Sequence, residues 1–180
     1  MALFPPIDAS PEEVREALRP LRNDFSVAVV AAENAFAVGA IVRVAHSFLA
    51  REIIVVGRAP YYPKASMGME KYESIVVVED VEAFFAHVAG RPVWCLEKDR
   101  AERAITAVES FPRNVVLTFG SERFGLPKEL LDRADAILGI PIYGINHSLP
   151  VAIAAGIAMH EWARRHYVAG GPGASSSSRG

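Results

Sequence analysis

The sequence predicts an α/β fold in which helices cover both faces of a mostly parallel sheet. Short β-branched runs alternate with helical patterns along the chain, and most of these runs are continuously apolar, as strands buried on both faces are. Hydrophobic residues make up 51% of the 180 residues and charged residues 22%, which is typical of a packed globular chain. We expect one domain, residues 1–168, followed by a flexible Gly/Ser-rich tail, residues 169–180.

The expected elements follow one another in this order. A surface helix over Ser10–Leu18 has a serine N-cap, a proline in its first turn and two glutamates near its positive end. A second helix is expected over Ala37–Phe48, whose apolar residues recur every three or four positions. Strands are expected at the apolar runs Phe25–Ala31, Ile53–Val56, Ile75–Val78, Val93–Leu96, Val115–Phe119 and Ala136–Ile140. Further short helices are expected at Val81–Val88 and Pro127–Arg133, with a short helix or turn near Ala101.

The longest helix, Val151–Arg165, is predicted to close the fold. Pro150 suits the first turn of this helix, where its missing N–H is not needed, and Ser148 is a natural capping residue. The run VAIAAGIAM is apolar on all sides, and Ala152 and Gly156 would let another backbone approach closely. We therefore favour a homodimer packed through this helix. An ordinary core helix in a monomer is the alternative.

Charge, cysteine content and hydropathy narrow the class of protein. The net charge of −2 gives no global basic field, although a local arginine patch could still bind nucleic acid. A single cysteine, Cys95, excludes an intramolecular disulfide, and no Cys/His cluster has the spacing of a metal site. Neither a secretory signal nor an apolar run of about 18 residues is present, so we expect a cytoplasmic protein without a membrane partner.

Three glycine-containing loops are expected to meet beyond the carboxyl ends of the strands, where open α/β sheets bind ligands. They are residues 120–126, 140–144 and 146–150. The sequence has neither the G-x-G-x-x-G pattern of dinucleotide-binding folds nor a P-loop. A pocket without a phosphate cradle suits a different ligand that contains adenosine.

Three blocks of the sequence, in this order, resemble the TrmH-like group of the SPOUT superfamily, which methylates ribose 2′-hydroxyls of RNA. They are NAFAVGAIVRVAHSF (34–48), TFGSERFGLP (118–127) and IPIYGINHSLPVAIAAGIAMHE (140–161). The segment SMGMEKY, between the first two blocks, is also similar to the family pattern. The resemblance implies S-adenosylmethionine as the cofactor, tRNA or rRNA as the substrate, a deep C-terminal trefoil knot, and an obligate homodimer whose active site uses both subunits.

The resemblance also implies roles for particular residues. Its catalytic positions match Arg43, Glu122 and Ser148. Arg43 is proposed in the family to act as a base, but a guanidinium is effectively never neutral in proteins, so we prefer that it holds a phosphate and stabilises the forming alkoxide. Substrate contacts are expected from Asn34, Arg43 and Arg123. The cofactor-binding positions match Phe119, Gly120, Glu122, Ile140, Ile142, Gly144, Ser148 and Leu149.

Two positions depart from the family pattern. Ala37 and Pro150 stand where the family usually has asparagine, so two amides that could bind substrate or fix the active loop are lost. The leading hypothesis is an RNA 2′-O-methyltransferase. The alternative is a catalytically altered or inactive SPOUT protein that binds S-adenosylmethionine or RNA as an accessory module, and a methyltransferase acting on a base or a non-RNA substrate is more remote.

Overall fold

The computed structural model describes residues 8–30, 34–57 and 63–166, and the predicted tail lies outside them. Seven strands form one sheet in the order β3-β2-β1-β6-β4-β7-β5, and every pair of neighbouring strands is parallel. The strands are β1 Ser26–Val30, β2 Ile53–Val56, β3 Ile75–Val78, β4 Val93–Leu96, β5 Arg103–Ala104, β6 Val116–Phe119 and β7 Ala136–Gly139.

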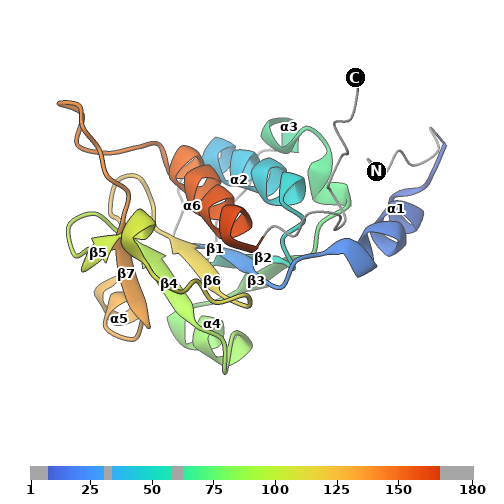
Figure 1. Cartoon of the computed structure of the whole chain (residues 1–180). Helices are drawn as coiled ribbons and strands as arrows, with labels where there is room; N and C mark the ends of the chain where they lie inside the picture. Colours follow the sequence, from blue (N-terminus) through green and yellow to red (C-terminus); the bar gives the residue numbers. More distant parts are fainter. Residues whose placement is uncertain (1–7, 31–33, 58–62, 167–180) are drawn as a thin grey trace, which may run out of the picture.

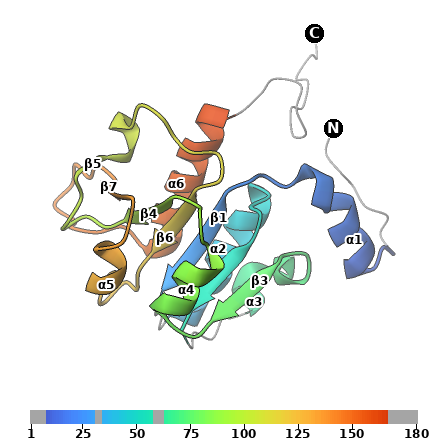
Figure 2. The same cartoon turned by 90° about the horizontal axis from the view of Figure 1, so that it is seen from below.

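Helices cover both faces of this sheet, as predicted. The α-helices are α1 Pro11–Leu18, α2 Ala35–Ser47, α3 Pro63–Ser66, α4 Val81–His87, α5 Lys128–Leu131 and α6 Val151–His166. The described residues also form single 3₁₀ turns between these elements: η1 Arg19–Leu21, η2 Met69–Lys71 and η3 Ile105–Ala107. Figure 1 shows α2 and α6 side by side on one face, with α4 and α5 beneath the other, and Figure 2 shows α4 and α5 from below.

Alternate residues of each central strand serve the two faces, which explains the continuous apolar runs. Val27 and Val29 of β1 point into the core under α2 and α6, whereas Ala28 and Val30 point into the core over α4 and α5. All four side chains are 2% exposed or less. Burial of both faces at this strand therefore fixes its position in the middle of the sheet.

The last helix returns across the sheet after β7 and lies against α2 (Figure 1). Its Trp162 ring lies 4.5 Å from that of Phe25, and the Trp162 indole N–H donates to the carbonyls of Pro112 and Arg113 at 3.1 and 3.2 Å. At Gly156 an added Cβ would lie 3.8 Å from a methyl of Val44 on α2. This small residue thus faces a helix of its own chain, so the close approach predicted there is satisfied without a second subunit.

Three local expectations need correction. The run 75–78 was expected to be buried, but β3 is an edge strand and its Val77 is 68% exposed. The two-residue strand β5 was not predicted, because Arg103–Ala104 is too short and polar to give an apolar run. Pro150 precedes α6 and is not in its first turn: its carbonyl accepts from the N–H groups of Ile153 and Ala154, at 2.9 and 3.0 Å.

Within the described ranges, no helix combines the length and apolar character that crossing a membrane requires.

Candidate functional site

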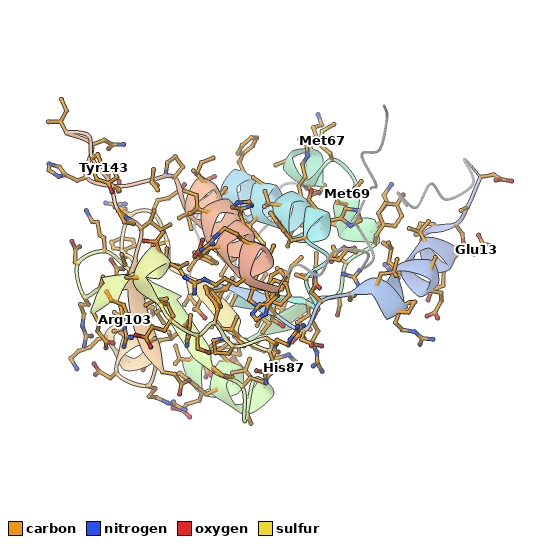
Figure 3. All side chains as sticks on the ribbon, viewed as in Figure 1. Glu13, Met67, Met69, His87, Arg103 and Tyr143 are labelled. Carbon is orange, nitrogen blue, oxygen red and sulfur yellow. The ribbon has the colours of Figure 1, made fainter. Side chains whose placement is uncertain are left out.

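A cleft of about 470 Å³ opens at the carboxyl ends of β4, β6 and β7. Its walls come from the segments that follow these three strands and from the start of α6. Of the residues predicted to bind a cofactor, those that line the cleft are Phe119, Gly120, Glu122, Ile140, Ile142, Ser148 and Leu149. Gly144 does not line it. The loop around Gly144 runs away from the sheet, and the neighbouring Tyr143, 97% exposed, lies far out on it (Figure 3).

The turn after β6 forms one wall of the cleft and is fixed by main-chain hydrogen bonds. Ser121 and Gly125 exchange two main-chain hydrogen bonds, at 2.9 and 3.2 Å, and the Ser121 hydroxyl accepts from the Phe124 N–H at 3.0 Å. Gly125 has φ +65°, and a Cβ at Gly120 would lie only 2.2 Å from the carbonyl carbon of Gly125. Glycine is therefore required at Gly120 because the chain folds back onto itself there.

Another part of the cleft lining is apolar, and the carboxylate of Glu97 adjoins it. Leu96, Leu138, Ile140 and Leu149 line it. Glu97, directly after β4, also lines the cleft, and its carboxylate accepts from the N–H groups of Leu126 and Asp99, both at 3.4 Å.

The sequence reasoning missed Glu97 and the whole segment 97–100, which also lines the cleft. The one available signal was a charged residue directly after a buried strand, at the edge of the sheet where ligands bind.

A smaller cavity of about 190 Å³ adjoins this cleft at the end of β1. Both are lined by Ser121, Glu122, Arg123 and Val151, and the smaller one is completed by Val29, Asn34 and Ala37. The carboxyl ends of β1 and β6 border it, and these strands are neighbours from which the chain winds in opposite directions. This is the switch point at which open α/β sheets place ligands.

Asn34 connects the start of α2 to the turn after β6. Its side-chain oxygen caps the helix by accepting from the N–H groups of Phe36 and Ala37, at 3.1 and 3.3 Å. Its amide nitrogen donates to the Glu122 carboxylate at 3.1 Å. Glu122 is thereby held at the boundary between the two cavities, by Asn34 and not by Arg43 of the same chain.

Arg43 lies apart from both cavities. It is exposed on the outer surface of α2, where no ion pair or side-chain hydrogen bond of its guanidinium is found among the described residues. It follows Ala37, which lines the smaller cavity, by six residues, so it is about 9 Å further along the helix and about 120° away around the helix axis. Arg43 therefore faces away from the cleft of its own chain.

The segment before α6 is held over the cleft by a contact with the loop after β4. Lys98 donates to the carbonyl of His147 at 2.9 Å, and Ser148 and Leu149 line the cleft directly after this contact. The predicted cap by the Ser148 hydroxyl is not found, since the Pro150 carbonyl begins the helical hydrogen bonds. Ser148 is thus exposed toward the cleft and makes no capping bond within the described part of the chain.

His46, one turn after Arg43, has a structural role. Its Nδ1 lies 2.7 Å from the Glu73 carboxylate, which also accepts two hydrogen bonds from Arg22, at 2.7 and 3.1 Å. The Glu73 side chain is fully buried, so it needs both partners. Within the described residues no group of three or more His, Cys, Asp or Glu side chains is arranged to hold a metal ion.

Comparison with known proteins agrees with this geometry. The model of the SpoU rRNA Methylase family matches residues 24–160, which include both cavities and α2. The chain belongs to the SpoU rRNA Methylase family. The predicted resemblance to TrmH-like SPOUT methyltransferases is thereby confirmed.

Individual SpoU relatives cover most of this chain. A tRNA (guanosine(18)-2′-O)-methyltransferase of Thermus thermophilus is 27% identical over 168 residues, which are 91% of this chain and 86% of the relative. An AdoMet-bound rRNA methyltransferase from Sinorhizobium meliloti superposes with a TM-score of 0.72 at 29% identity, covering 84% of this chain but 61% of that chain. A TrmH/SpoU tRNA modifying enzyme of A. aeolicus superposes with a TM-score of 0.75 at 23% identity. The match covers 86% of this chain and 81% of the A. aeolicus chain and shows that the two share a fold.

The residues of the larger cleft fit the adenosyl donor, S-adenosylmethionine. Its volume of about 470 Å³ is in the range of small-molecule sites, which are about 300–1,000 Å³. Apolar side chains suit the faces of a purine, and the turn at Gly120 brings bare backbone to the cleft wall without an intervening Cβ. The carboxylates of Glu97 and Glu122 suit a ligand that carries a sulfonium and hydroxyl groups.

Proposed function

We propose that this chain is an S-adenosylmethionine-dependent RNA methyltransferase that methylates a ribose 2′-hydroxyl of tRNA or rRNA. The observation that carries the proposal is the contiguity of the two cavities, because the turn 121–123 borders both. A donor in the larger cavity and a ribose in the smaller one would meet at Glu122. When bound, the donor would supply a methyl group from its sulfonium and keep the electron pair of that bond on sulfur, and the ribose oxygen that takes the methyl group would release its proton to water.

Within the larger cleft, main-chain groups would hold the donor. The backbone at Phe119, Gly120, Ile140, Ile142 and Leu149 lies around the cleft and can give hydrogen bonds to the adenosine portion. The wall after β6 is fixed by its two hydrogen bonds between Ser121 and Gly125. A wall fixed in advance lowers the entropic cost of binding.

In the smaller cavity, polar groups would receive the target nucleotide. Asn34, held between the first turn of α2 and Glu122, presents an amide beside the site, and Ser148 presents a hydroxyl from the larger cleft. Arg123 is exposed and borders both cavities, so it can pair with a phosphate of the RNA. These contacts orient a ribose without reading the base.

The charge needed in the transition state would come from Arg43 of a second subunit. In its own chain Arg43 lines neither cavity, whereas Arg123, which lines both, is assigned above to a phosphate of the RNA, so Arg43 would have to reach a site from a partner subunit. Ile153 and Ile157 on the outer side of α6 are 53% and 37% exposed, which gives an apolar surface for a second copy. We therefore infer a homodimer in which each Arg43 serves the cleft of its partner, binding a phosphate and stabilising the forming alkoxide.

Two further expectations belong to this proposal. A trefoil knot formed by the segment 140–150 is supported by the family membership and by the return of α6 to α2 after β7. A cytoplasmic location follows from the proposed tRNA or rRNA substrate. Limited proteolysis at 140–150, followed by refolding, would test the trefoil knot. Fractionation of cells would test the cytoplasmic location.

The direct test uses radiolabelled S-adenosylmethionine and total RNA from a strain that lacks the gene. We expect label in tRNA or rRNA, in an alkali-resistant dinucleotide that reports 2′-O-methylation. RNA from the parent strain, already modified, is the control and should accept much less label. Equal labelling of both RNAs, or none at any salt concentration, would contradict the proposal.

A catalytically altered protein is the second candidate, and one observation favours it. The methyl group of Ala37 lines the smaller cavity where the family usually has an asparagine amide, and Pro150 replaces a second asparagine beside the cleft. The double variant A37N/P150N tests this candidate, since the helical hydrogen bonds of α6 start at the main-chain carbonyl of residue 150 and survive the change. An inert protein that becomes active on this change supports the second candidate, whereas an active wild type rejects it.

A further inference from the structure

We propose that Glu97 recognises the ribose of the methyl donor, its carboxylate accepting hydrogen bonds from the 2′- and 3′-hydroxyls of the adenosine portion. This inference rests on the proposed function, because it assigns a residue to the donor cleft described above. Glu97 directly follows β4 and lines the cleft together with Leu96, Leu138 and Leu126.

The Glu97 carboxylate has hydrogen-bonding capacity that the protein leaves unused. An ionised carboxylate has about four acceptor sites on its two oxygens. The hydrogen bonds found for it among the described residues come from the N–H groups of Asp99 and Leu126, and both are long, at 3.4 Å. A half-buried carboxylate with such weak partners is stabilised by any ligand that brings O–H or N–H donors.

Nearby cations do not satisfy Glu97. Lys98 and Arg100 lie in the same loop, but Lys98 donates to the His147 carbonyl and Arg100 pairs with Asp132 at 3.2 Å. No ion pair of Glu97 is found in the described part of the chain. A carboxylate that only stabilised the loop would be expected to pair with one of these neighbouring cations. Because both cations have other partners, the Glu97 carboxylate is available to a ligand.

The neighbours of Glu97 indicate which ligand group it meets: its N–H donates to the Leu138 carbonyl at 3.0 Å, and its carboxylate lies against Gly125 and Leu126 of the turn after β6. The apolar side chains of Leu138, Ile140 and Leu149 suit the purine, and the reacting sulfonium must face the smaller cavity at Glu122. In the donor, the ribose joins these two groups. Glu97 lies against the far end of the same turn as Glu122, its carboxylate 2.6 Å from where a Cβ of Gly125 would be.

A vicinal diol matches this carboxylate better than a single donor does. Two adjacent hydroxyls can donate to its two oxygens at once, which adds geometric specificity to the binding energy. The competing ligand group is the α-ammonium of the methionyl part, which would form an ion pair with Glu97 instead. The two possibilities differ in which donor analogue should lose affinity.

Calorimetric titration of the full chain with three ligands separates these cases. The ligands are S-adenosylhomocysteine, its 2′,3′-dideoxy analogue and its deaminated analogue. We expect the wild type to bind S-adenosylhomocysteine roughly ten- to one-hundred-fold more tightly than the dideoxy analogue, as for hydrogen bonds to a charged group. E97Q should lose most of this preference by weakening only the ligands that keep the diol. E102Q, which changes an exposed carboxylate that lines neither cavity, should keep the preference.

The outcomes also separate this inference from the proposed function. If the wild type fails to bind S-adenosylhomocysteine, the proposed function itself is wrong. If it binds but does not distinguish the dideoxy analogue, or if E97Q weakens every ligand by the same factor, Glu97 does not read the diol. If the deaminated analogue alone is insensitive to E97Q, the carboxylate recognises the ammonium. Thermal melting of E97Q checks folding, and the wild-type comparison stands even if that variant is unstable.

Discussion

The cleft at the carboxyl edge of the sheet and the outer surface of α2 each carry part of the proposed active site, and they are built differently. The cleft is made of loops that contact one another within one chain: Asn34 bonds to Glu122, Lys98 to the His147 carbonyl, and Ser121 to Gly125. Arg43 on α2 is exposed and faces away from these loops. Under the proposed function, one chain would suffice to bind the donor, whereas transfer of the methyl group would need a second chain.

The largest expected effect is on catalysis at Arg43. R43A should lower methyl transfer by about a hundredfold or more, the usual loss when a group that stabilises transition-state charge is removed, and leave donor affinity within about twofold. Rates of label transfer and calorimetry measure the two quantities. R51A changes an exposed arginine shortly after the same helix and should alter neither. If R43A lowered donor affinity and methyl transfer by the same factor, the proposed division of roles between the cleft and the surface of α2 would be wrong.

At the turn after β6 we expect a substitution to lower donor affinity directly. In G120A the added Cβ would lie 2.2 Å from the Gly125 carbonyl carbon, so the turn must move. The donor should then bind about five- to one-hundred-fold more weakly, since overpacking typically costs about 1–3 kcal/mol. Calorimetry with S-adenosylhomocysteine measures this. G156A is the matched control, because its Cβ makes only an ordinary contact with Val44. Undiminished affinity in G120A would show that this wall of the cleft does not touch the donor.

A smaller effect concerns the rigidity of the cleft edge. Cys95 of β4, two residues before Glu97, lies in the core over α4 and α5, and burial raises the pKa of its thiol to about 12, with the nearby charges of Glu97 and Asp135 adding to the shift. About one thiol in ten thousand is then ionised at pH 8, so we expect a thiol reagent to react only as fast as the protein unfolds. Mass spectrometry follows the labelling. If the thiol reacts fast and bound S-adenosylhomocysteine slows this reaction, the cleft opens when it is empty.

The smallest effect is a pH dependence at the far end of α6. Burial lowers the pKa of His166, and the charges of Arg113 and Arg165 add to this, against a hydrogen bond to the Phe111 carbonyl. The neutral ring is thus favoured in the folded state. Its stabilising contribution is present above pH 6.5, the ordinary value for histidine, and is lost as the pH falls through the lowered pKa.

Chemical unfolding at pH 7.5 and pH 5.5 measures this contribution. H166Q should lose less stability between the two values than the wild type, and donor affinity of the wild type should change little, since His166 is not in the cleft. An identical pH dependence in the variant and the wild type would contradict the assignment.

Most of the sheet could be predicted because its central strands are apolar on both faces, as in the runs 53–56 and 93–96. Strand β5 could not, since two residues carry no periodicity. The turn 120–126 was predictable from its glycines, whereas Glu97 was not, because a single acidic residue after a strand has no distinguishing pattern. Gly144 was assigned to the cofactor by family pattern alone, and the path of its loop depends on contacts that the sequence does not display.

The spatial separation of Arg43 from Glu122 is the feature that most needed a structure. Both residues belong to blocks of the family pattern, and that pattern says nothing about which chain each one serves. Only the direction of α2, set by the Asn34 cap and by the burial of Val38, Ile41 and Val42, turns Arg43 away from its own cleft. Under the proposed homodimer, this orientation turns a list of residues into a predicted requirement for a partner.

The most direct test of that requirement is a mixed dimer of R43A and G120A chains, co-expressed with different tags and purified through both. Neither parent should transfer methyl groups efficiently. In the mixed dimer one site combines an intact cleft with an intact arginine from the partner, so about half of the wild-type activity should return. A mixed dimer as inactive as its parents, or a wild-type chain fully active as a monomer, would contradict the account.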